Sequence, residues 1–138
     1  MLTTMEKVFR LKGVPIFSDL DGENLAEVAS IAEELERGPG DEIIREGDVD
    51  DSLYVIVAGR VSVTKGGRVL AELAEGEVVG ELALLDPAPR GASVRGLSDV
   101  VLLRIDASHF FEIMEEKHEI ARAVMRILAR RLRLAADH

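Results

Sequence analysis

The 138-residue chain contains no cysteine. A protein without thiols cannot form a disulfide scaffold, a cysteine nucleophile or a zinc ribbon. This absence fits a cytoplasmic setting, which we take as the expected location. The sequence also lacks an apolar run near the roughly 20 residues that cross a bilayer, and its first residues show no basic-then-apolar secretion signal. We therefore expect no membrane span in this chain.

Basic residues are scarce relative to acidic ones. The chain has 17 Lys and Arg against 26 Asp and Glu, which gives a net charge of -9 at pH 7. A negative surface opposes the phosphate attraction that supplies most non-specific affinity for nucleic acid. We expect no direct DNA binding, and any site for an anion must depend on local donors.

Histidine is also rare, and this argues against metal-dependent chemistry. The three histidines are His109, His118 and His138, and all of them follow the strand-like part of the chain. A cupin needs histidines inside its β-roll to bind iron or manganese, so cupin chemistry is excluded. The acidic stretch 48–51 lacks the glycine and the distal glutamate of an EF-hand loop. The sequence predicts no metal site.

A hydrolase site is the other catalytic possibility. Residues 91–95, Gly-Ala-Ser-Val-Arg, resemble a nucleophile elbow, but the closing glycine is displaced to Gly96 and no histidine partner is marked. We therefore expect a chain that is no enzyme and uses no catalytic cofactor.

The hydrophobic residues that are present predict one α+β domain over residues 1–138. Hydrophobic residues make up 47% of the chain, enough for a core without disulfides. In a segment of about 14–36, apolar residues recur every three or four positions, which is typical of an amphipathic helix. A second, uninterrupted helix is expected over 107–136, which contains no internal glycine or proline.

Between these helices the pattern is that of β-structure. Residues 38–105 carry short apolar runs separated by glycines, and Gly66-Gly67 is typical of a tight hairpin turn. Many short strands predict an antiparallel, jelly-roll-like β-roll. The predicted fold is thus a β-roll with an N-terminal helical segment and a long C-terminal helix.

One stretch inside the roll, residues 80–93, combines a carboxylate with a guanidinium. It reads Gly-Glu-Leu-Ala-Leu-Leu-Asp-Pro-Ala-Pro-Arg-Gly-Ala-Ser. Glu81 can accept a hydrogen bond from a hydroxyl group, and Arg90 can bind an oxyanion through its rigid fork of donors. A sugar phosphate presents both groups, and the prolines beside Arg90 stiffen its loop.

This stretch resembles the phosphate-binding cassette of the cyclic nucleotide-binding domain family. The family includes regulatory subunits of the cAMP-dependent kinase, the catabolite activator family and cyclic nucleotide-gated channels. The interval from Glu81 to Arg90 fits the kinase-type cassette without insertion. Segments 14–17, 38–48 and 52–61 resemble the family's entry segment, first strands and glycine turns, so the resemblance covers about 14–133.

The resemblance implies a cyclic nucleotide as ligand. Glu81 would take the ribose 2′-hydroxyl and Arg90 the cyclic phosphate, with the backbone amides of Ala83 and Gly91 also donating to that phosphate. The implied ligand-binding residues are Gly80, Glu81, Leu82, Ala83, Arg90, Gly91, Ala92 and Ser93. In the family, a threonine immediately after the cassette arginine is associated with cGMP. Gly91 stands there, which favours cAMP.

The resemblance also implies a regulatory module that passes occupancy through its final helix to an attached effector domain or protein. Ala135 and Ala136 stand where the catabolite activator family has hydroxyls that contact adenine. One of Arg130, Arg131 and Arg133 could cover the base instead. The apolar stripes of this helix make a homodimer a further hypothesis.

Two alternatives remain open. The chain could be an interaction module that keeps the roll and binds no nucleotide, or the same pocket could take cGMP or a cyclic dinucleotide.

Overall fold

The computed structural model describes residues 1–137. They form two compact units, which we describe separately. The roll unit contains residues 32–107, and the helical unit is formed by residues 2–31 and the described residues from 108 onward. The expectation that residues 1–138 act as one domain stays a prediction.

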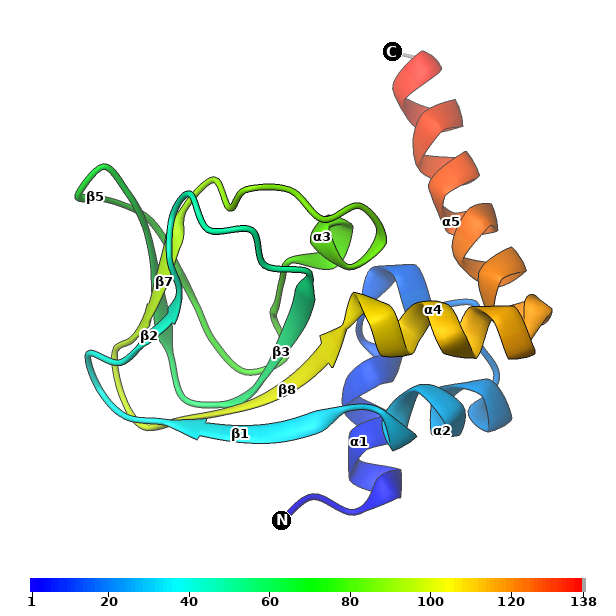
Figure 1. Cartoon of the computed structure of the whole chain (residues 1–138), viewed down its shortest axis with the longest axis horizontal. Coiled ribbons are helices and arrows are strands. Elements are labelled where there is room, and N and C mark those ends of the chain that lie inside the picture. Colours follow the sequence, from blue (N-terminus) through cyan, green and yellow to red (C-terminus); the bar gives the residue numbers. More distant parts are fainter. Residues whose placement is uncertain (138) are drawn as a thin grey trace. The chain divides into compact units, whose positions relative to one another are not determined.

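The roll unit consists of two antiparallel sheets (Figure 1). Sheet one has the strand order β1-β8-β3-β6, and sheet two the order β2-β7-β4-β5. The strands are β1 (Glu33–Arg37), β2 (Glu42–Ile44), β3 (Ser52–Ala58), β4 (Val61–Lys65), β5 (Arg68–Leu73), β6 (Val78–Val79), β7 (Ser93–Gly96) and β8 (Val100–Asp106). A short helix, α3 (Glu81–Leu85), follows β6. The predicted α+β fold with an antiparallel β-roll is confirmed.

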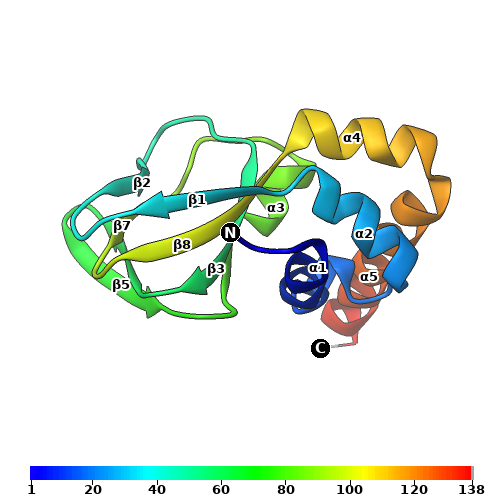
Figure 2. The same ribbon diagram turned by 90° about the horizontal axis from the view of Figure 1, so that it is seen from below.

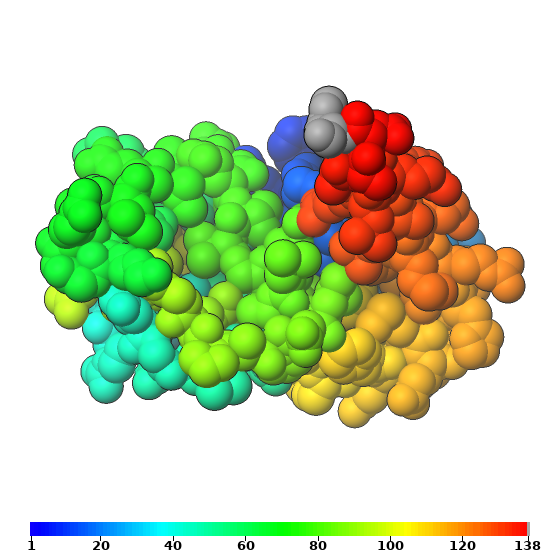
Figure 3. All heavy atoms as spheres, turned by 90° about the horizontal axis from the view of Figure 1, so that it is seen from above, coloured from blue at the N-terminus to red at the C-terminus, as the bar shows by residue number. Residues whose placement is uncertain are grey.

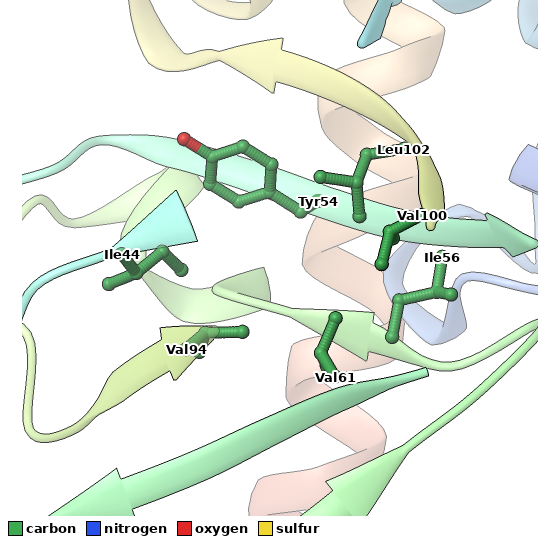
Figure 4. Packing of buried hydrophobic residues seen from close by; sticks show 7 residues of the cluster. All are labelled: Ile44, Tyr54, Ile56, Val61, Val94, Val100 and Leu102. Atoms are coloured by element: carbon green, nitrogen blue, oxygen red, sulfur yellow. The ribbon is translucent and has the colours of Figure 1, made fainter. Parts of the chain in front are cut away.

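Side chains from both sheets meet in the core of the roll (Figure 4). The buried members are Ile44, Tyr54, Ile56, Val61, Val94, Val100 and Leu102. They come from β2, β3, β4, β7 and β8. Because alternate residues of a strand face the same side of its sheet, the inward-facing residues of these strands meet in one core. The Tyr54 ring lies in this cluster, and its hydroxyl points away from Leu102 and Val100.

The predicted hairpin turn is present between β4 and β5. Gly66 and Gly67 both have positive φ angles, 56° and 81°. Two successive residues with positive φ are what a tight hairpin turn needs, and glycine adopts them without a Cβ clash.

The helical unit contains α1 (Thr4–Lys12), the 3-10 turn η1 (Pro15–Phe17), α2 (Gly22–Ser30), α4 (Ala107–Glu116) and α5 (His118–Ala136) (Figure 2). Its buried aromatic residues Phe17 and Phe110 lie with ring centroids 5.5 Å apart. Asp19 accepts hydrogen bonds from Arg126 and Arg130 of α5, the latter bidentate at 3.0 and 3.2 Å. These contacts attach α4 and α5 to the segment around η1.

Two predicted helices are corrected. The segment of about 14–36 is not helical to its end, because residues 33–37 form β1 and pair antiparallel with β8. The expected single helix 107–136 is two helices, since Lys117 has φ -122° and ψ 84°, which no α-helix continues through. The long C-terminal helix of the fold prediction is α5.

Candidate functional site

The surface around α3 contains a pocket of about 450 Å³. It is lined by Val78, Gly80, Glu81, Leu82, Ala83, Asp86, Ala88, Pro89, Arg90 and Gly91. Six of the eight residues predicted for the site are among them, and Ala92 and Ser93 are not. The same segment, coloured green to yellow-green, lies open on the surface in Figure 3.

A larger hollow of about 570 Å³ lies elsewhere on the roll, along residues 36–38 and 99–101. None of the predicted site residues lines it, and its cation, Arg37, is exposed. The smaller pocket is therefore the better candidate for an anionic ligand, because its cation is buried.

Gly80 makes room for Arg90. It precedes α3 with φ +83°, and its carbonyl accepts a hydrogen bond from the Leu84 amide at 3.2 Å. A Cβ at position 80 would lie 2.5 Å from the Ser52 carbonyl oxygen and would also collide with the Arg90 guanidinium. Only glycine tolerates both this dihedral angle and this contact.

The backbone of Arg90 is fastened to the loop before β3. Its amide donates to the Asp48 carbonyl at 2.8 Å, and its carbonyl accepts from the Gly47 amide at 2.8 Å. An isolated bridge between Val49 and Pro89 continues this pairing. The position of Arg90 therefore depends on a segment about 40 residues away in the sequence.

The Arg90 side chain is buried, with 8% of its surface exposed. Its Nη2 donates to the Ser52 carbonyl and lies 3.4 Å from Oδ1 of Asp50. Its Nε is buried and has no hydrogen-bond partner among the described residues. Buried polar atoms are seldom left unpaired, so this guanidinium retains capacity to bind an acceptor.

Asp50 and Tyr54 do not line the pocket, but they lie behind Arg90 and were missed by sequence reasoning. Asp50 accepts hydrogen bonds from the Ser52 amide at 2.9 Å and from the Tyr54 hydroxyl at 3.2 Å. Burial, and next the charge of Asp50, raises the pKa of Tyr54. The spacing Asp-x-Ser ahead of a strand is a signal for the local turn, because an aspartate often accepts from the amide two residues on. Nothing in that spacing points to Arg90.

Of the other residues predicted for ligand binding, Glu81 lies at the pocket, whereas Ser93 and Arg130 make contacts elsewhere. Glu81 is the first residue of α3, half-buried at the pocket. The Ser93 hydroxyl accepts from the Glu46 amide at 2.9 Å, so Ser93 fastens β7 to the loop after β2. Of the arginines proposed to cover the base, Arg130 is bound to Asp19.

Two negative findings apply to residues 1–137. No cluster of three or more acidic or histidine side chains in this range could hold a metal ion. No helix in the described part of the chain has the length and apolar character needed to cross a membrane.

Comparisons with known proteins agree with this geometry. The profile of the cyclic nucleotide-binding domain matches residues 34–117. An uncharacterized NTE family protein of Mycobacterium tuberculosis is 36% identical over 124 residues, covering 89% of this chain and 21% of the relative. The Cyclic AMP receptor protein of Thermus thermophilus is 32% identical over 130 residues, covering 91% of this chain and 60% of the relative.

A solved structure, the N-terminal domain of a transcriptional regulator from Streptomyces coelicolor A3(2), is similar over nearly the whole chain. It has a TM-score of 0.86 and 36% identity, covering 94% of this chain and 95% of that one. The chain thus spans about a fifth of the mycobacterial relative and all but a few residues of a separately solved domain. From its cassette, its roll and these matches, the chain belongs to the cyclic nucleotide-binding domain family.

Proposed function

We propose that this chain is a sensor module that binds a cyclic nucleotide reversibly, prefers cAMP, and catalyses no reaction on it. The observation that carries the proposal is the burial of the Arg90 guanidinium at the pocket. The guanidinium is held from behind by Ser52 and Asp50, and its buried Nε has no hydrogen-bond partner among residues 1–137. A charged donor in this position suits an anionic oxygen.

The proposed roles of Arg90 and Glu81 follow from the two polar groups of the ligand, its phosphate and its ribose hydroxyl. Arg90 would bind the cyclic phosphate, and Glu81, nine residues earlier on the same pocket wall, would accept from the ribose 2′-hydroxyl. Arg90 Nε is covered in this structure, so its donation to a ligand requires the side chain to rotate. Leu82, Ala83 and Ala88 line the same pocket and supply apolar surface.

The preference for cAMP rests on position 91. Glycine has no hydroxyl to offer the amino group of guanine, and Gly91 lines the pocket directly after Arg90. The Thermus thermophilus relative is named a Cyclic AMP receptor protein, which supports the same choice.

We further propose that α5 passes occupancy to an effector and that the module works in the cytoplasm. The mycobacterial relative is about five times longer than the aligned segment, which is consistent with a module attached to other domains. Met125, Leu132 and Leu134 of α5 are exposed apolar residues on which an effector, or a second copy of the chain, could pack. A ligand can shift α5 only by binding its two arrangements with different affinity.

Calorimetric titration of cAMP and cGMP into ligand-free protein tests the proposal. We expect cAMP to bind about tenfold more tightly than cGMP, and Arg90→Leu to lose roughly 2 to 5 kcal/mol of binding free energy. Arg95→Leu is the matched control, because Arg95 is an exposed arginine of β7 that pairs with Glu42. Folded wild-type protein that binds neither nucleotide would overturn the proposal in favour of an interaction module. Tighter binding of cGMP would overturn the cAMP preference alone.

A further inference from the structure

The candidate pocket holds little positive charge for a site that takes an anion. Its lining contains one cation, Arg90, and two carboxylates, Glu81 and Asp86. A third carboxylate, Asp50, lies 3.4 Å from Arg90 Nη2. The chain as a whole carries a net charge of -9, so the protein has no overall positive charge that would attract an anion.

Asp50 approaches Arg90 from outside the pocket. It does not line the candidate pocket, and it belongs to a separate hollow together with Asp48 and Arg104. The Ser52 amide binds Oδ1 at 2.9 Å and the Tyr54 hydroxyl binds Oδ2 at 3.2 Å, so both carboxylate oxygens are held. The Asp50 side chain is 22% exposed, so solvent screens its charge only in part.

We infer that Asp50 is a positioning and specificity residue, which makes the site accept a singly charged phosphodiester and reject a doubly charged phosphate monoester. The inference rests on the proposed function of the same pocket. Asp50 holds the guanidinium in place and cancels part of its charge. The positive charge that remains is less than one unit, so a ligand with one negative charge is tolerated better than a ligand with two.

The two ligand classes differ in charge by one unit at neutral pH. A phosphate monoester has a second pKa near 6 and carries close to two negative charges above it, whereas a phosphodiester carries one. Repulsion between unit charges in a partly buried site amounts to a few kcal/mol before screening. A sensor built in this way would ignore the monoester that forms when a cyclic nucleotide is hydrolysed.

The test uses three adenine nucleotides at pH 8: cAMP, 5′-AMP, and the monomethyl ester of 5′-AMP. The ester is an open-chain phosphodiester, so it separates the effect of charge from that of the ring. In wild-type protein we expect both diesters to bind more tightly than 5′-AMP. In Asp50→Asn we expect 5′-AMP to gain about tenfold in affinity relative to the methyl ester.

Two further variants separate charge from general structural damage. Asp50→Glu keeps the charge, so we expect it to retain the wild-type ratio of the two affinities even if both fall. Asp51→Asn removes one carboxylate from the same loop, and we expect the ratio to remain within about twofold of wild type. Thermal unfolding of each variant confirms that it is folded.

The outcomes distinguish this inference from the proposed function. Wild-type protein that binds cAMP, with an unchanged affinity ratio in Asp50→Asn, overturns the inference alone. An equal change of that ratio in Asp51→Asn also overturns it, because the effect would then be one of net charge. Folded wild-type protein that binds none of the three nucleotides overturns both.

Discussion

Gly80 and Arg90 lie so close together that a methyl group on the first would collide with the guanidinium of the second. The contact joins the residue before α3 to the cation of the pocket. It gives the glycine a role in placing a charge, in addition to its role in the turn. The two residues therefore form one structural unit of the candidate site.

Replacement of Gly80 by alanine should damage ligand binding more than stability. A non-glycine residue at φ +83° is strained by about 1 kcal/mol or more, and the new methyl group would displace Arg90. We expect cAMP affinity to fall by about tenfold or more, as measured by calorimetry. The control is Gly76→Ala, where φ is +87° but an added methyl group would meet nothing within 4 Å. Equal binding by the two variants would refute the role of the contact.

The ionisation of Tyr54 reports on Asp50. Tyr54 is the single tyrosine of a chain without tryptophan, so its absorbance near 295 nm can be followed alone. Burial, and then the charge of Asp50, raises its pKa, so we expect a titration midpoint above the usual value of about 10. Because the folded protein favours the protonated phenol, stability falls as pH rises past the pKa of the unfolded chain. Asp50→Asn should lower the midpoint, and an unchanged midpoint would contradict the observed pairing.

The aromatic contact in the helical unit should stabilise it measurably. Phe110 is fully buried against Phe17, whereas its neighbour Phe111 is 39% exposed. Truncating a buried phenylalanine to alanine costs about 3 to 5 kcal/mol, so Phe110→Ala should destabilise the protein by about that amount in urea unfolding. Phe111→Ala should cost about 1 kcal/mol or less. Similar losses in the two variants would show that α4 presents a different face.

The ion pair between Asp19 and α5 should depend on pH. Hydrogen bonding to Arg130 lowers the pKa of Asp19, so its contribution to stability is present above the pKa of the unfolded chain. That contribution is lost as pH falls through the folded pKa. Asp19→Asn should therefore lower the melting temperature slightly at about pH 6 and leave it unchanged at about pH 2.5. The exposed acid Glu23 in α2 provides the control, Glu23→Gln, and an equal effect there would argue against a specific pair.

The sequence predicted the strands of the β-roll more accurately than the limits of the helices on either side of it. The turn at Gly66-Gly67 could be predicted because two adjacent glycines specify local dihedral angles. The strand β1 was predicted as helix, because Ala32 and Leu35 continue the spacing of the preceding helix. Its residues, Glu33–Arg37, become a strand only by pairing with β8 about 65 residues later. The break at Lys117 carries no glycine or proline to mark it.

The helix α1 was missed, although its first turn contains a recognisable signal. Thr3 and Glu6 form a capping box, in which each side chain binds the backbone amide of the other. The spacing of threonine and glutamate by three residues is the sequence mark of that arrangement.

In the candidate site, too, local features could be predicted from the sequence and long-range contacts could not. Glu81 and Arg90 could be predicted as candidate ligand-binding residues because both lie in one short segment whose residue types suit a sugar phosphate. The support behind Arg90 comes from Asp48, Asp50 and Ser52, about 40 residues earlier. Only the folding of the loop before β3 onto the cassette brings them together, and no local pattern encodes that contact.

The most direct test of phosphate binding by Arg90 follows its side chain during ligand binding. In a 15N-1H spectrum of guanidinium groups, the Nε-Hε signal of Arg90 can be assigned as the one that is absent in Arg90→Lys. We predict that saturating cAMP moves this signal downfield and slows its exchange with water, because Nε gains an anionic acceptor. The Arg95 signal should stay in place. An Arg90 signal unchanged at saturating cAMP would contradict the claim that this guanidinium binds the phosphate.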